Sequence, residues 1–177
     1  MEPVKIHVPN ELMEPAEMQE FEGTCQLSRL SMNGDDYAFS EPCTWRVQVT
    51  NTGGALLVRG AAQAEGVCAC ARCLEDARIP LTGEVEGYFV ISPEGEDEEM
   101  EDDEFEALPE SHDIDLAPLI VQGLMLDAPA RPLCREDCAG LCPRCGQDLN
   151  QGTCSCASEE DADAGNPFAV LRGLTFD

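Results

Sequence analysis

Nine of the eleven cysteines in this 177-residue chain fall into two short groups, and their spacing constrains the fold more than any other feature. The later group contains Cys142-Pro-Arg-Cys145-Gly146, followed by Cys154-Ser-Cys156. Two thiolates two residues apart can grip one metal ion, and the glycine after the second allows a tight turn. Four thiolates around Zn²⁺ form a closed structural site. We therefore predict a zinc knuckle with the ligands Cys142, Cys145, Cys154 and Cys156.

The earlier group, Cys68 to Cys73, contains a second C-x-x-C pair, Cys70 and Cys73. Together with Cys134 and Cys138 this pair could bind a second ion and tie the first half of the chain to its tail. Two alternatives stay open: Cys138 replaces Cys154 or Cys156 in the knuckle, or the earlier pair binds no metal. Thiol–disulfide catalysis is disfavoured because no βαβ pattern surrounds the pair.

The net charge of −26 excludes broad wrapping of nucleic acid, which needs clustered Lys and Arg. No apolar run is long enough to span a membrane, and the first ten residues do not look like a secretory signal. We therefore expect a cytoplasmic protein, in which many cysteines indicate metal more often than disulfides. The remaining two cysteines, Cys25 and Cys43, are expected to be isolated, buried small side chains.

Alternating apolar residues predict strands at 4–8, 45–49, 55–58, 61–68 and 84–91. Asn51-Thr-Gly-Gly54 predicts a hairpin turn between the second and third of these. The segment Glu11 to Phe21 could form a short helix, although Pro15 weakens it. A longer helix is predicted over 115–127, with Asp115 as N-cap. The predicted fold class is α+β: a β-rich core, either an antiparallel sheet or barrel-like, with one main helix and a C-terminal cysteine-rich zinc-knuckle module.

Three regions follow from the changes in composition. Residues 1–133 form the β-rich core domain, interrupted by an acidic loop at 93–112. Within that loop, ten of the thirteen residues from Glu94 to Glu106 are acidic, which is typical of a solvated segment. Residues 134–157 form the cysteine-rich zinc-binding module, and residues 158–177 form an acidic linker with an Asn-Pro-Phe terminal segment.

The chain lacks the marks of an enzyme: it has two histidines, no phosphate-binding loop and no dinucleotide fingerprint. Half of its ten basic residues lie within the cysteine segments. They either compensate the negative charge of metal thiolates or form a small face that contacts phosphate. The candidate contact residues there are Arg72, Arg135 and Arg144.

The order of motifs resembles the YceD family, the large ribosomal RNA subunit accumulation proteins. The resemblance is carried by Cys70-x-Arg-Cys-Leu, an acidic insertion, Ile114-Asp-Leu-x-Pro-Leu-Ile, the later cysteines and Asn166-Pro-Phe-Ala-x-Leu. It covers roughly Cys70 to Leu174. It carries over Asn166, Pro167 and Phe168 as possible contacts with RNA or a partner.

The resemblance implies a non-enzymatic role in 23S rRNA accumulation or processing and in assembly of the large ribosomal subunit. The implied partners are a ribosomal RNA precursor, a basic large-subunit ribosomal protein, or both, with no membrane and no small-molecule substrate. The alternative is a zinc-braced protein-interaction or regulatory module unrelated to ribosomes.

Overall fold

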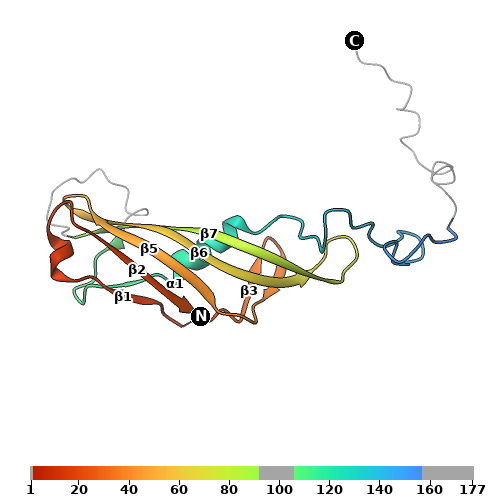
Figure 1. The fold of residues 1–177 in the computed structure, drawn as a ribbon, viewed down its shortest axis with the longest axis horizontal. Helices are drawn as coiled ribbons and strands as arrows, with labels where there is room; N and C mark the ends of the chain where they lie inside the picture. Colours follow the sequence, from red (N-terminus) through yellow and green to blue (C-terminus); the bar gives the residue numbers. More distant parts are fainter. Residues whose placement is uncertain (1, 92–105, 157–177) are drawn as a thin grey trace, which may run out of the picture.

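A long hairpin of β6 (Ala55–Ala69) and β7 (Asp76–Val90) dominates the fold (Figure 1). The computed structural model describes residues 2–91 and 106–156 of the chain. Both strands have 15 residues and pair antiparallel without interruption, so each spans roughly 50 Å. Buried and exposed side chains alternate along β7, as in a sheet with one face toward solvent. The turn at residues 70–75 is thereby held at the far end of the hairpin.

The other strands extend this hairpin into one sheet. β5 (Cys43–Asn51) pairs antiparallel with the first half of β6, and β2 (Met18–Cys25) pairs with β5. A short hairpin of β3 (Arg29–Met32) and β4 (Asp35–Ala38) meets β6 near its end. The two-residue strand β8 (Glu106–Ala107) lies parallel to the end of β7. The order is β2-β5-β6-β4-β3, with β7 on the other side of β6.

The helix α1 (Ala117–Asp127) packs against β7 and contributes the fully buried Ile120 and Leu124 to the core. The helix and the strand approach each other most closely at Gly123 of α1 and Gly83 of β7. A Cβ atom on Gly123 would lie 2.1 Å from the carbonyl oxygen of Glu84 in β7. Only glycine fits here, so the sequence sets how tightly the helix sits on the sheet.

A separate two-stranded sheet joins the chain's beginning to the segment before α1. It consists of β1 (Lys5–His7) and β9 (Asp113–Asp115). The predicted helix starts two residues later than expected, at Ala117, and the cap position belongs to Leu116. Asp115 still accepts the N–H of Ala117 at 3.0 Å, so it satisfies one free donor of the first turn.

The predicted helix at Glu11 to Phe21 is wrong. Asn10–Met13 form one 3-10 turn, η1, and β2 begins at Met18. β2 lies at the sheet edge with its glutamates toward solvent, so its sequence lacks the apolar alternation of an inner strand. The predicted strands at 55–58 and 61–68 form the single strand β6. The β3–β4 hairpin was not predicted, although Asn33-Gly34 is a strong turn signal.

The prediction of a β-rich core with one main helix is confirmed for the described residues. The predicted loop at 93–112 falls largely outside the described residues, and its last part contains β8. The tail, residues 128–156, leaves α1 and passes the turn of the long hairpin (Figure 1). None of the described helices has the length and apolar character needed to cross a bilayer.

Candidate metal centres and sheet surface

Four cysteines meet where the β6–β7 turn contacts the tail: Cys70 and Cys73 of the turn, Cys134 and Cys138 of the tail. Their Sγ atoms all lie within 4.8 Å of one another. The Cys70–Cys138 and Cys73–Cys134 sulfur distances are 3.8 and 3.7 Å. Sulfurs bound tetrahedrally to zinc at about 2.3 Å would lie roughly 3.8 Å apart. This set, the first cluster, could therefore hold a metal ion.

Hydrogen bonds fasten the tail to the turn beside the first cluster. The N–H of Ala71 donates to the carbonyl of Pro132 at 2.8 Å, and the N–H of Leu141 donates to that of Arg72 at 3.0 Å. The guanidinium of Arg72 donates to the carbonyl of Cys138 at 2.8 Å. Arg72, a predicted partner contact, is thus already engaged within the protein.

A second set of four, the second cluster, forms within the tail. Its Sγ atoms also lie within 4.8 Å of one another, and the sulfurs of Cys142 and Cys154 are 3.4 Å apart. Gly146 has φ +74° and donates its N–H to the carbonyl of Cys142 at 2.9 Å, the tight turn expected of a knuckle. This set could hold a metal ion too; its members are Cys142, Cys145, Cys154 and Cys156.

One thiol in each cluster has a pKa below its usual value. Burial opposes ionisation of Cys70, but backbone N–H groups, that of Arg72 first, outweigh it and lower the Cys70 pKa to about 6. The backbone N–H groups of Cys145 and Arg144 lower the Cys142 pKa to about 6 as well. Cys156, hydrogen-bonded to its neighbouring thiols, has a pKa raised to about 12. Metal binding would therefore release protons from the remaining thiols.

The structure brings the cysteines into the two sets of four that the spacing suggested, and places Cys138 in the first rather than with Cys154 and Cys156. Asn150 lies in the loop between Cys145 and Cys154, and its side chain contacts the first cluster: its Nδ2 donates to the Cys138 sulfur at 3.5 Å, and its Oδ1 accepts from Arg135 at 2.7 Å. Sequence reasoning missed Asn150, which carries no signal until the tail is folded.

The arginines predicted to contact a partner differ in whether their guanidinium groups are already bonded within the protein. Arg135 bonds to Asn150 and lies 3.3 Å from a carboxylate oxygen of Asp137. Arg144 is exposed and has no hydrogen-bond or ion-pair partner for its guanidinium among residues 2–91 and 106–156. The other candidates, Asn166, Pro167 and Phe168, lie outside the described residues.

Cys25 and Cys43 are not isolated from each other, contrary to expectation. They are directly opposite in the β2–β5 register, with Cys43 buried and Cys25 half-buried. Burial raises the pKa of Cys43 to about 12, so this thiol is unreactive at neutral pH. Their predicted role as small buried side chains fits this environment.

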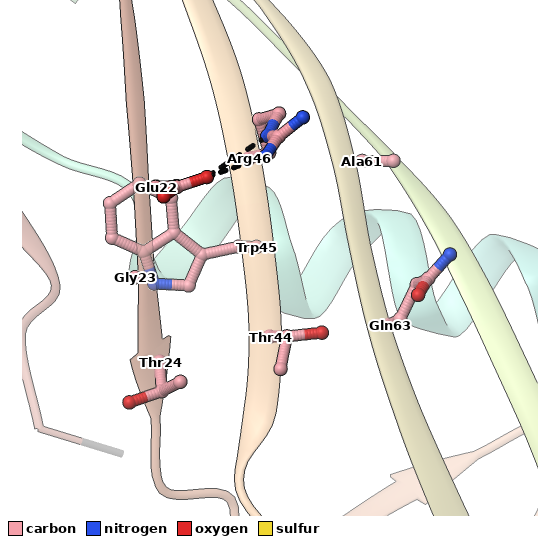
Figure 2. Close-up of a pocket in the computed structure, with 8 residues that line it drawn as sticks. All are labelled: Glu22, Gly23, Thr24, Thr44, Trp45, Arg46, Ala61 and Gln63. Atoms are coloured by element: carbon pink, nitrogen blue, oxygen red, sulfur yellow. Dashed lines mark hydrogen bonds and ion pairs between the residues drawn. The ribbon is translucent and has the colours of Figure 1, made fainter.

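The solvent face of the sheet has an open pocket of about 600 Å³ across β2, β5 and β6 (Figure 2). Polar side chains line it, including Glu22 and Arg46, which form an ion pair at 2.6 Å. On the opposite face of β2 and β5, the indole of Trp45 packs over Gly23, where a Cβ atom would lie 2.6 Å from its ring. Similar exposed pairs join the neighbouring strands: Arg59 with Glu86, and Arg78 with Glu65. The face is therefore polar, and its arginines are already neutralised.

The fold and clusters define a β-sheet protein whose cysteine-rich tail is fastened to the tip of its longest hairpin. The chain belongs to the YceD family, described as large ribosomal RNA subunit accumulation protein, whose family model matches residues 58–175. The match begins in β6 and includes both clusters. The resemblance inferred from the motifs is thereby confirmed.

Two kinds of relatives resemble the chain, and one of them bears the family's name. Proteins of Mycobacterium tuberculosis and Mycobacterium bovis, both described as uncharacterized, are 35% identical over 103 residues, covering 58% of this chain and 49% of each relative. The Arabidopsis thaliana chloroplastic large ribosomal RNA subunit accumulation protein YCED homolog 1 is 33% identical over 64 residues, covering 36% of this chain and 20% of that protein. The chain spans about half the length of the mycobacterial relatives. No solved structure was found to match.

Proposed function

We propose that this chain supports the accumulation and processing of 23S ribosomal RNA, and so the assembly of the large ribosomal subunit, without catalysing a reaction. The observation that carries the proposal is the family match over residues 58–175. The relative from Arabidopsis thaliana that bears the family's name supports it.

The partner we propose is a basic large-subunit ribosomal protein, a ribosomal RNA precursor, or both, met in the cytoplasm. A net charge of −26 would steer basic proteins toward the chain and repel phosphates. Any RNA contact would therefore be small. Arg144 is the best placed of the described candidates for it, because its guanidinium is exposed and unpaired there. No membrane or small-molecule substrate is part of the proposal.

We further propose that each cluster binds one structural zinc ion. Four thiolates suit zinc and leave no open position for a substrate. In the first cluster the ion would join the hairpin turn to the tail; in the second it would brace residues 142–156. Three regions follow: a core of residues 1–133, a zinc-binding module of 134–157, and a terminal segment of 158–177.

Deleting the gene tests the ribosomal role. We expect less 23S RNA relative to 16S RNA, with fewer complete large subunits in a sucrose gradient, and restoration of both by the intact gene. Unchanged RNA ratios and subunit profiles in the deletion strain would refute the role.

A zinc-braced interaction module unrelated to ribosomes remains the competing function. The first cluster is compatible with it, because an ion that joins two segments of the same chain would brace any binding surface. Affinity purification from growing cells, with sequencing of bound RNA and mass spectrometry of bound proteins, separates the two. Large-subunit proteins and precursor RNA support the ribosomal role, whereas reproducible capture of other proteins alone supports the competitor.

A further inference from the structure

Among the described residues, no strand pairs with the outer edge of β2. In the described part of the chain β2 pairs only with β5, along all eight of its residues. The corresponding edge of β7 is engaged, because the N–H of Thr82 donates to Asp127 at 2.7 Å and β8 pairs near the strand's end. A long open edge is a template for another strand.

The backbone groups that point outward can be assigned from the register. Just beyond the strand ends, Asn51 donates its N–H to Glu17 at 2.9 Å, and Thr52 donates to Ala55 at 2.9 Å. Hydrogen bonding alternates along an antiparallel pair, and the β2–β5 register is unbroken. Odd-numbered residues of β2 therefore bond to β5. The N–H and C=O groups of the even-numbered residues point away from the sheet; these are Met18, Glu20, Glu22 and Thr24.

The two faces beside this edge differ in chemistry. Glu20 and Glu22 are exposed on the solvent face; Arg46 neutralises Glu22, and Glu20 has no ion-pair partner in the described part of the chain. On the opposite face lie the half-buried Phe21 and the Trp45 indole that covers Gly23. A strand added to β2 would place alternate side chains against carboxylates and against aromatic rings.

We propose that the open edge of β2 binds an extended protein segment as an additional strand, in which Lys or Arg alternates with apolar residues. Main-chain hydrogen bonds would supply affinity, and the alternating side chains would supply specificity. RNA does not fit, because it cannot continue a peptide ladder and the edge carries carboxylates. The identification of the segment as part of a ribosomal protein rests on the proposed function. The addition of a strand to β2 does not depend on that function.

The test uses the full-length, metal-loaded protein and a capped synthetic peptide, Lys-Val-Lys-Val-Arg-Val-Lys. The control is the same peptide N-methylated at two alternate residues, which removes donors from one edge. We expect the peptide to slow amide hydrogen exchange at Glu20, Glu22 and Thr24 at least tenfold, with Val47 of β5 unchanged. The methyl groups are placed on the edge of the peptide that would pair with β2. The methylated peptide should therefore give no such protection.

Thr24→Pro removes one outward N–H while leaving the bonds to β5 intact, which an edge strand tolerates. It should weaken peptide binding about tenfold, and Thr24→Val should not. If Thr24→Pro does not fold, Glu20→Lys serves instead, because Glu20 is exposed and unpaired in the described residues, and it should also weaken binding. Tryptophan fluorescence from Trp45 checks folding.

The inference is overturned if the peptide does not bind at millimolar concentration, if the protected amides lie elsewhere, or if folded Thr24→Pro binds normally. Displacement of the peptide by a single-stranded RNA oligomer would overturn it as well. The RNA ratio in the deletion strain is independent of the peptide assay. Strand addition can therefore fail while the ribosomal role stands, and the reverse.

Discussion

Removing metal from the first cluster should release the tail from the hairpin turn without unfolding the sheet. The three shortest of the described hydrogen bonds that hold the tail there run from Ala71 to Pro132, from Leu141 to Arg72, and from Arg72 to Cys138. At about 1 kcal/mol each they contribute about 3 kcal/mol. Structural zinc in small modules contributes about 10–16 kcal/mol of apparent binding free energy. The ion would therefore be the main attachment.

Hydrogen exchange read by mass spectrometry measures this release. At about 3 kcal/mol the amides of Ala71 and Leu141 should keep a protection of only roughly a hundredfold after a zinc chelator is added. With metal bound their protection should be far higher. The amide of Val58, in the centre of the sheet, should not change. As a matched control, Cys145→Ser disrupts only the second cluster and should leave Ala71 protected.

Two outcomes would refute this reasoning. If metal loss is verified by elemental analysis and Ala71 stays fully protected, the hydrogen bonds and packing hold the tail without the ion. If Val58 loses protection together with Ala71, the tail is not a separate unit and the cluster stabilises the whole sheet. Absence of zinc from protein purified under reducing conditions would refute the metal proposal itself.

Three further predictions concern the core and the N-terminal sheet. Gly123→Ala should lower the free energy of unfolding by about 1–3 kcal/mol in denaturant titrations, despite better helix propensity, because its Cβ would lie 2.1 Å from a backbone oxygen of β7; equal or higher stability would contradict the close packing. Gly23→Ala should displace the indole of Trp45, the single tryptophan, and shift its emission; an unchanged spectrum would show that the ring does not pack there. The hydrogen bond from His7 lowers the Asp113 pKa, so this pair stabilises the fold above the unfolded pKa, about 3.9, and loses that contribution as pH falls through the lower folded pKa. Asp113→Asn should remove this acid dependence from pH titrations of stability.

Local signals predicted the parts of the fold that depend on neighbouring residues. The β5–β6 turn and α1 were found because turn glycines and helical periodicity act over a few positions. The edge strand β2 was mistaken for part of a helix, because the exposed glutamates of an edge strand resemble those of a helix surface. Nothing in the local sequence indicated that Cys25 faces Cys43, because that pairing is set by the register of two strands.

In the two cysteine clusters, too, the features set by neighbouring residues were predictable and those set by the folded chain were not. The second cluster could be grouped from the sequence because its four cysteines lie within fifteen consecutive positions, 142–156. The first could be grouped only by combining the cysteines left over, because it joins residues of the hairpin turn to residues of the tail. The contacts of Arg72 and Asn150 could not be foreseen, since both depend on where the folded tail lies.

The two clusters close chain loops of very different length, which bears on the order in which they form. Cys70 and Cys138, in contact in the first cluster, are 68 positions apart, whereas Cys142 and Cys154 are 12 apart. The entropic cost of closure grows as the logarithm of loop length, so the longer loop costs about 1.5 kcal/mol more. During synthesis the second cluster can assemble soon after Cys156 emerges. The first must wait until the hairpin of two 15-residue strands has positioned its turn, so it should be the last part of the fold to close.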